Sequence, residues 1–197
     1  MREPSTVDLY PPARFTGACL IIAPLLFASS TFLWSDGEYG IYGGAVLAVA
    51  MVFWIPAFIA LFGLLRSRMP RYATWALLPA WYGCVSGSLF GFQGIYSAAF
   101  AIGNEMERAA YSEYPLAFNL TLFWPGPLFP LSLTLLGLCL LWKRAAPAWA
   151  AVLLCLSGIA FPVSRIARIE WVAHLSDALL LLPSLYLGWQ ILRKQET

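Results

Sequence analysis

The segment RIARIEWVAHLSDALLLLP, residues 165–183, places ionisable side chains at the start of a long apolar run. If this segment is helical, Glu170, His174 and Asp177 stand at i, i+4 and i+7 and share one face. An ionisable side chain inside a membrane is costly, so it normally faces the protein interior and has a partner there. Histidine also titrates near neutral pH. The spacing therefore predicts that Asp177 and His174 handle a proton or hold a polar ligand, with Glu170 nearer the aqueous edge.

A structural interpretation of the same residues remains open. In this interpretation, Arg165 or Arg168 neutralises Glu170 at the membrane surface, and His174 forms a hydrogen bond with Asp177 or with a backbone carbonyl group. Exposed ion pairs of this kind contribute little to stability. The sequence alone does not decide between a functional pair and a structural cluster.

Other apolar segments contain further polar and aromatic side chains. Gln93 and Asn119 offer neutral hydrogen-bonding groups, whereas Tyr96 and Trp124 offer aromatic faces. An aromatic box that binds a cation or an isoprenoid is one use of such rings, and ordinary packing is the alternative. The predicted ligand-binding residues are Asp177, His174, Gln93, Asn119, Trp124, Tyr96 and Glu170.

The residue types that hold metals and cofactors are scarce. The chain has a single histidine and four cysteines, and the cysteines lack a Cys-x-x-Cys spacing. One histidine excludes bis-histidine haem ligation within the chain and leaves a zinc site short of nitrogen ligands. We therefore predict no metal and no cofactor. The absence of nucleotide-binding, nucleophile-elbow and His-Glu-x-x-His motifs argues against nucleotide-driven pumps and against serine or zinc hydrolases.

The elements that must position these residues are apolar helices. Of the 197 residues, 60% are hydrophobic and only 11% are charged, a composition typical of membrane proteins. A membrane-spanning helix needs about 20 predominantly apolar residues. We predict an all-α polytopic membrane protein, with residues 1–197 forming a single domain of six transmembrane helices. The predicted segments are residues 15–34, 41–65, 74–103, 115–142, 147–164 and 170–192.

The distribution of Lys and Arg predicts the orientation. Nine of the twelve lie on one side of the predicted bundle: Arg2, Arg14, Arg66, Arg68, Arg71, Lys143, Arg144, Arg193 and Lys194. Because basic residues favour the cytoplasmic side, both termini are expected in the cytoplasm. The expected location is a bacterial inner membrane or a plasma membrane. The net charge of +2 gives no indication of nucleic-acid binding.

Glycines and prolines indicate how the helices pack. Gly83, Gly87 and Gly91 recur every four residues, a pattern common where helices approach closely. This stripe predicts either packing within the bundle or a homodimer seam. In the fourth segment, the sequence FWPGPLFP, residues 123–130, predicts a kinked or broken helix because proline removes a backbone donor. A break is tolerated in a membrane where it borders protein or a wet cavity, so we expect a cavity there.

The two halves of the chain resemble each other weakly. An offset of 106 residues aligns Pro24 with Pro130 and Pro56 with Pro162, and LLPAWY at residues 77–82 resembles LLPSLY at residues 181–186. One hypothesis is a duplication of three helices. Three is an odd number, so the halves would be inverted in the membrane, as in many secondary transporters. Chance matches between leucine-rich helices are the alternative.

These patterns predict a membrane protein that binds, with or without transport, a small amphipathic or hydrophobic molecule at an intramembrane polar and aromatic site. The expected partners are membrane lipids and this ligand, with no nucleic acid. One alternative is a membrane-embedded enzyme in which Asp177 or Glu170 serves as acid or base on a lipid or isoprenoid. Another is a non-catalytic interaction subunit that uses the glycine stripe.

Overall fold

The computed structural model describes residues 11–34 and 37–194, which form helices joined by short turns and loops. Within these ranges no β-strand is present, which confirms the predicted all-α class. Of the residues used above to predict the orientation, Arg2 lies outside the described ranges.

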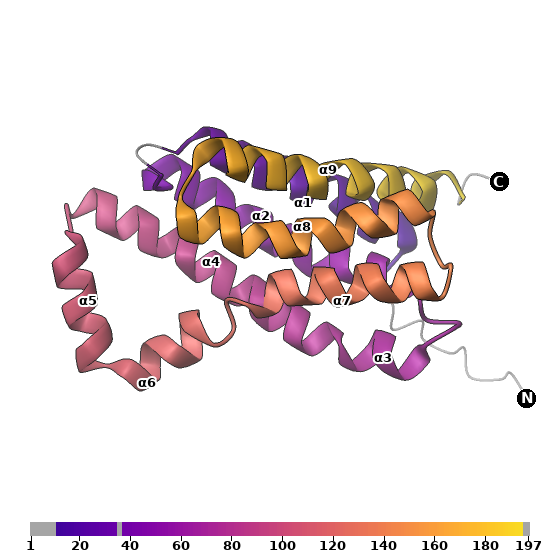
Figure 1. Ribbon diagram of the computed structural model, residues 1–197, viewed down its shortest axis with the longest axis horizontal. Coiled ribbons are helices and arrows are strands. Elements are labelled where there is room, and N and C mark those ends of the chain that lie inside the picture. Colours follow the sequence, from indigo (N-terminus) through magenta and orange to yellow (C-terminus); the bar gives the residue numbers. More distant parts are fainter. Residues whose placement is uncertain (1–10, 35–36, 195–197) are drawn as a thin grey trace, which may run out of the picture.

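The first half of the chain forms three long helices and one short one. Helix α1 (Ala13–Phe32) follows Pro12, and α2 (Gly40–Gly63) runs antiparallel to it (Figure 1). The short helix α3 (Pro70–Trp75) begins at a proline, which is well tolerated in a first turn. Helix α4 (Leu77–Ala99) follows α3 after Ala76.

The fourth predicted segment is interrupted, as its prolines indicated. Helix α6 (Pro115–Phe118) continues into the π-helix η1 (Asn119–Phe123), and α7 (Leu128–Trp142) begins only after a turn. Before this segment lies α5 (Asn104–Glu113), which has no buried residue and which the apolar pattern did not predict.

The last two helices form an antiparallel pair. Helix α8 (Ala148–Ala167) ends at Arg168, whose φ of 51° is left-handed, and α9 (Glu170–Arg193) starts two residues later. A residue in this conformation stops a helix by turning the chain out of its axis. The sharp connection therefore places the first turn of α9 beside the last turn of α8.

Five of these helices are long and apolar enough to cross a membrane, counting α6 to α7 as one interrupted span. They are α1, α2, Pro115–Trp142, α8 and α9. These five apolar helices suggest a multi-pass membrane protein. Helix α4 is not among them, although its 23 residues would extend about 34 Å. Its glycines and its polar residues lower its hydropathy, so the predicted sixth span is not confirmed.

The long helices contact one another in a closed order. Helix α1 packs on α2, α2 on α4, α4 on α7, α7 on α8, and α8 on α9, which returns to α1. Small residues allow close approach at several of these contacts. A Cβ atom at Gly188 would lie 2.9 Å from the carbonyl oxygen of Gly17, where α9 meets α1. A Cβ atom at Gly158 would lie 2.5 Å from the oxygen of Pro130, where α8 meets α7.

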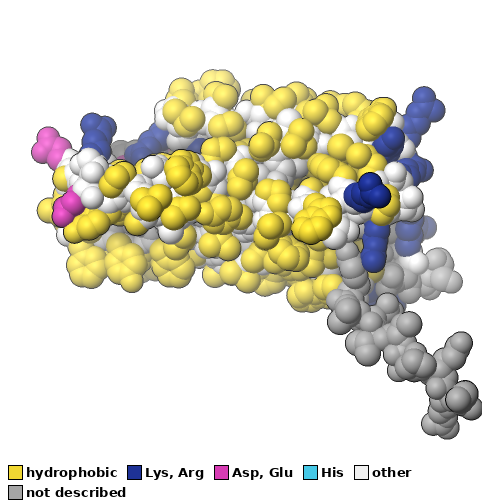
Figure 2. All heavy atoms as spheres, turned by 90° about the horizontal axis from the view of Figure 1, so that it is seen from below, with side chains coloured by type: hydrophobic (Ala, Val, Ile, Leu, Met, Phe, Trp, Pro, Cys, Tyr) yellow, Lys and Arg dark blue, Asp and Glu magenta, His cyan; other side chains and the backbone are white. Residues whose placement is uncertain are grey.

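Charged side chains gather at the two ends of the elongated molecule (Figure 2). One end shows only Lys and Arg among its charged residues in this view, and it contains the start of α1 and the end of α9. Here Arg68 donates a hydrogen bond to the carbonyl oxygen of Lys143, which joins the loop after α2 to the end of α7. The face that Figure 2 shows is mainly hydrophobic between the two ends, as expected for a membrane-spanning protein.

The glycine stripe of α4 packs inside the chain. A Cβ atom at Gly83 would lie 2.4 Å from the backbone nitrogen of Phe129, and one at Gly91 would lie 2.5 Å from the carbonyl oxygen of Gly44. At Gly87 it would meet the side chain of Met51. These contacts agree with the within-bundle interpretation of the stripe, whereas homodimerisation through it stays a prediction.

The proposed duplication is not confirmed by the positions of the aligned prolines. Pro56 and Pro162 both lie inside helices, α2 and α8. Pro24, however, lies in the middle of α1, whereas Pro130 lies in the first turn of α7. The inverted-repeat hypothesis therefore stays a prediction.

Candidate functional site

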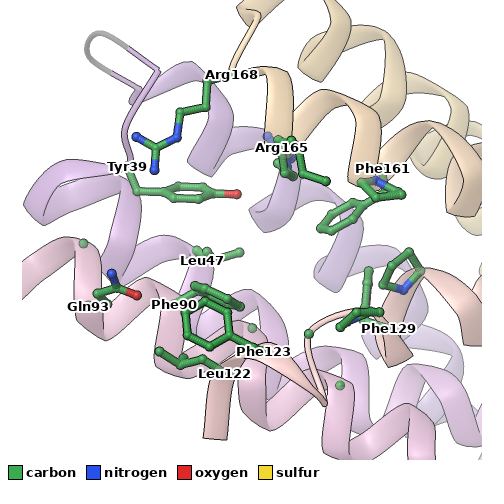
Figure 3. A pocket seen from close by; sticks show the side chains of 18 of the residues that line it. Tyr39, Leu47, Phe90, Gln93, Leu122, Phe123, Phe129, Phe161, Arg165 and Arg168 are labelled. Carbon is green, nitrogen blue, oxygen red and sulfur yellow. The ribbon is translucent and has the colours of Figure 1, made fainter. Parts of the chain in front are cut away.

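A cavity of about 970 Å³ lies between α4, α5, α7, α8 and the connection from α1 to α2 (Figure 3). This volume is near the upper end of the ~300–1,000 Å³ that ligand pockets usually have. The prolines and glycine of the broken segment border it directly, with Gly126, Pro127 and Pro130 in its wall. The cavity expected beside the break is confirmed.

The cavity lies where the fourth segment is interrupted. Before the break, η1 packs against α4, and after it, α7 packs against both α4 and α8. Pro125 and Pro127, two residues apart, have no backbone N–H to donate to the preceding turn, and the regular helix resumes only at Leu128. The displaced first half leaves space beside the C-terminal part of α8, where Phe161, Pro162 and Arg165 form one wall.

Side chains of α4 satisfy carbonyl groups of the π-helical region. Ser86 donates a hydrogen bond of 2.9 Å to the carbonyl oxygen of Leu122, and Tyr82 donates one to that of Leu120. The backbone N–H of Gly126 also donates to the oxygen of Leu122, at 2.9 Å. Buried backbone polar groups must be paired, and these bonds hold the broken segment against α4.

The deep part of the cavity is aromatic. Phe129 is 1% exposed and contacts four other rings, with centroid distances of 5.4 to 6.0 Å. These neighbours are Phe27, Trp54, Phe58 and Phe161. Offset and edge-on ring contacts at such distances are favourable. Phe129 and Phe161 both line the cavity, so its deep wall is rigid and apolar.

Arg165 is a buried cation in the cavity wall, and the carboxylate of Asp177 balances its charge. One terminal nitrogen of Arg165 lies 2.8 Å from a carboxylate oxygen of Asp177 and 3.1 Å from the hydroxyl oxygen of Thr31. The two side chains are 13% and 4% exposed. This ion pair therefore joins α8, α9 and α1 near the end of the molecule that carries α5.

Aromatic rings surround the guanidinium group of Arg165. Its central carbon lies 4.7 Å from the ring centroid of Trp34, 5.1 Å from Phe27, 5.3 Å from Phe161 and 5.8 Å from Tyr39. Ring faces attract a cation at these distances. Burial raises the pKa of Tyr39 to about 12, so its hydroxyl, which points toward Arg165, stays protonated (Figure 3).

A second polar cluster connects α4 with α5. Gln93 Nε2 lies 3.2 Å from Glu107 Oε2 and also bonds the hydroxyl of Tyr111, while Ser97 donates to the other carboxylate oxygen. Tyr111 donates to Glu107 at 3.3 Å. Burial, and then the charge of Glu107, raise the pKa of Tyr111 to about 12. These four residues line the cavity and hold α5 over it.

The outer part of the cavity is charged. Arg168 and Glu38, both about half exposed, form an ion pair of 2.5 Å beside it. Asn104 and Arg108 of α5 complete this rim. The cavity is thus polar toward the helix ends and apolar toward Phe129.

A smaller cavity of about 560 Å³ adjoins the first one. It is lined mainly by apolar side chains of α4, α5, α6 and η1, among them Leu89, Phe92 and Phe118. Gln93, Ser97, Glu107 and Tyr111 line both cavities, so the polar cluster forms their common wall.

Glu170, His174 and Asp177 of α9 occupy different environments. Asp177 is buried and paired with Arg165, Glu170 is exposed, and His174 is half-buried with its ring 4.3 Å from that of Phe32. None of the three is among the residues that line the cavities. The structural interpretation paired Glu170 with Arg165 or Arg168, but these arginines pair with Asp177 and Glu38.

The other predicted site residues are also separated. Gln93 lines both cavities, and Tyr96, 57% exposed, lines the smaller one. Asn119 begins the π-helix, where its carbonyl oxygen accepts a bond from the N–H of Trp124. Trp124 is 58% exposed, and neither of these two lines a cavity.

Several cavity residues escaped the sequence interpretation. Glu107 and Tyr111 stand four residues apart in α5, a spacing that indicates a shared face, but the segment has no apolar run to predict its position. Arg165 was considered only as a partner of Glu170. Its place within an apolar helix was the signal that it has a buried role.

In the described part of the chain, no group of three or more His, Cys, Asp or Glu side chains could hold a metal ion. Comparisons with protein-family models, with curated proteins and with solved structures found no match to this chain.

Proposed function

We propose that this chain binds a small amphipathic molecule in the cavity between α4, α5, α7 and α8. The observation that carries the proposal is the polarity of the cavity along its length. Charged and amide groups of Glu38, Gln93, Arg108 and Arg168 stand at one end, and Phe129 stands at the other. A ligand with a polar head and an apolar body satisfies both ends, whereas a wholly polar ligand would lose hydration against the aromatic wall.

We place this site in a membrane crossed by six helices, with α4 as the sixth. The space-filling surface supports this arrangement, because its charged residues lie at the two ends and its sides are apolar. Helix α4 packs between α2 and α7, both apolar enough to span. Both termini then lie at the basic end, which the positive-inside rule assigns to the cytoplasm.

The binding proposal is tested with a glycine that lines the cavity. A Cβ atom at Gly94 would meet its nearest neighbour, Tyr39, at an ordinary 3.4 Å, so the position accepts a side chain and Gly94→Leu should narrow the cavity. Gly63→Leu is the matched control, because no atom lies within 4 Å of its Cβ position. Mass spectrometry of the protein purified in mild detergent should find a co-purifying amphipathic molecule in the wild type and in Gly63→Leu, at reduced occupancy in Gly94→Leu. Equal occupancy in all three would refute this site.

The proposal extends to transport: the chain should then carry the co-purified molecule across the membrane, and its uptake into proteoliposomes measures this.

A membrane-embedded enzyme is the alternative function. Two carboxylates line the cavity, Glu38 and Glu107, and neither Asp177 nor Glu170 does. Glu38 is paired with Arg168, so conversion of the ligand should then depend on Glu107. Loss of turnover in Glu107→Gln, with retained ligand unchanged, would favour the enzyme.

A further inference from the structure

The cavity has an apolar rim as well as a charged one. Four of its lining side chains are also exposed on the surface: Ile166 by 82%, Ile159 by 54%, Leu131 by 48% and Phe123 by 43%. They come from α8, α7 and the π-helical part of the broken segment. In a membrane-spanning chain, this combination of exposure and hydrophobicity places them against lipid.

The arrangement of the helices accounts for this rim. Helix α8 packs on α7 and α9, while η1 packs on α4 and on α6. The first half of the fourth segment therefore does not cover the C-terminal part of α8. Ile159 and Ile166 lie on this part, two turns apart, and Phe123 stands at the end of η1.

Two side chains of the cavity wall, Arg165 and Trp34, carry buried hydrogen-bond donors without partners. Arg165 uses one terminal nitrogen for Asp177 and Thr31, whereas its Nε and its other terminal nitrogen are buried and have no hydrogen-bond partner. The indole nitrogen of Trp34, whose ring lies over this guanidinium group, is also buried and unpaired. Buried donors are rarely left unpaired, so these three nitrogen atoms call for an acceptor.

The volume of the cavity is sufficient for one acyl chain. A sixteen-carbon acid has about 18 non-hydrogen atoms, which at ~30 Å³ each need less than the 970 Å³ of the cavity. One acyl chain therefore fits between the apolar rim and the wall around Phe129.

We propose that the ligand is a single-chain acidic lipid that enters from the membrane between α8 and the broken fourth segment and places its head group against Arg165 and Trp34. This inference rests on the proposed function and names its ligand class. The unpaired donors of Arg165 and Trp34 favour an acid, because its oxygens accept hydrogen bonds. Net charge does not decide this, because Arg165, Arg168 and Arg108 are balanced by Asp177, Glu38 and Glu107.

The first experiment measures which head group is recognised. The full chain in mild detergent is incubated with palmitate, hexadecyl phosphate, methyl palmitate or acetate, and bound molecules are counted by native mass spectrometry. At least one of the two acids should bind at least about tenfold more tightly than methyl palmitate, because an ester is a weaker partner for guanidinium donors. Acetate should neither bind nor displace either acid. Equal binding of the ester would overturn the acidic head group, and displacement by acetate would overturn the lipid.

Two variants test the donors. Arg165→Lys keeps a charge for Asp177 but cannot supply the fork of N–H groups, so it should weaken binding of the acid about tenfold. Trp34→Phe keeps a ring beside the guanidinium group and removes only the indole N–H, so it should weaken binding by a smaller factor. Melting temperatures establish that each variant is folded. If Arg165→Lys does not fold, Trp34→Phe carries the test, and unchanged binding by folded variants contradicts the proposed head-group contacts.

The entry route is tested by enlarging one side chain of the rim. Ile159→Trp should slow association of the acid about tenfold by narrowing the opening. Leu156→Trp is the matched control, because Leu156 lies on the same helix, is 44% exposed and does not line the cavity. Equal association rates in the two variants would exclude lateral entry. If a neutral molecule co-purifies in the cavity while neither acid binds, the proposed function stands and this inference fails.

Discussion

At the scale of single residues, one buried ion pair organises the end of the molecule that holds the cavity. Arg165 and Asp177 stand on consecutive helices, and the sharp turn at Arg168 brings them to 2.8 Å. Removing one partner of a buried pair leaves the other charge without compensation, which typically costs more than the pair itself contributes. The ring faces around Arg165 soften this cost but do not replace the carboxylate.

Asp177→Asn should lower the free energy of unfolding by about 3 kcal/mol, because Arg165 stays buried without its counter-charge. Glu38→Gln breaks the exposed pair with Arg168 and should change stability by at most about 1 kcal/mol. Denaturation of both variants in the same detergent measures the difference. An Asp177→Asn protein as stable as the wild type, but without its co-purified molecule, would instead favour the ligand-binding role first predicted for Asp177.

Tyr111 gives a pH-dependent contribution. Its pKa rises from 10.0 to about 12 through burial and then the charge of Glu107, so folding favours the protonated phenol. The associated stability is fully present below about pH 10 and is lost as the pH rises toward about 12. Melting temperatures across this range should fall less steeply in Tyr111→Phe than in the wild type. Parallel curves would mean that Tyr111 titrates normally.

The ion pair shows what residue types alone could predict. A carboxylate and arginines near one helix end indicated pairing, but not which arginine takes which carboxylate. The left-handed turn at Arg168 decides this by bringing α9, with Asp177, back beside Arg165, while Arg168 itself stays exposed beside Glu38. A single backbone angle in a short connection has no signal in hydrophobic periodicity.

At the scale of elements, α4 depends on how closely its glycines approach other backbones. The nearest atom to a Cβ at Gly91 is a backbone oxygen of α2, at 2.5 Å, whereas a Cβ at Gly87 meets the flexible side chain of Met51. A methionine can turn aside, but a helix backbone cannot move without disturbing its own packing.

Gly91→Ala should therefore destabilise the protein by about 1 to 3 kcal/mol, and Gly87→Ala by clearly less. Gly103→Ala is the control for replacing glycine by alanine, because no atom lies within 4 Å of a Cβ atom at this position. Thermal denaturation in one detergent ranks the three variants. A larger loss of stability in Gly87→Ala than in Gly91→Ala would show that the backbone of α2 moves aside more easily than the side chain of Met51.

The apolar segments and the break in the fourth one were predictable, because hydropathy and proline act locally. Helix α5 was not, since it is polar and no residue of it is buried. Hydrogen bonds from Gln93 and Ser97 to Glu107 position it on α4, and such long-range contacts leave no periodic pattern in the sequence. The cavity could be anticipated beside the prolines, but its second wall could not.

At the scale of the whole molecule, the charged ends predict the topology. Reporter fusions after Arg68, Lys143 and Arg193 should report the cytoplasm, and fusions after Glu38 and Glu107 the opposite side. The fusion after Glu107 decides whether α4 crosses the membrane, because without this span Glu107 and Arg68 lie on the same side. Cytoplasmic signals at both Glu38 and Glu107 would reverse the proposed orientation.

The contact between α1 and α9 also has a consequence for biosynthesis. During translation, α1 is inserted long before α9 has been synthesised. Until α9 is in place, Arg165 lacks the carboxylate of Asp177, and nothing holds Arg165 in position for its hydrogen bond to Thr31. Contacts between the first and last elements of a chain form late and slowly, and here such a contact is the packing of α9 against α1. The face of α1 that α9 later covers is therefore the surface that insertion factors must shield during translation, and the surface by which proteases of the membrane would recognise a stalled chain.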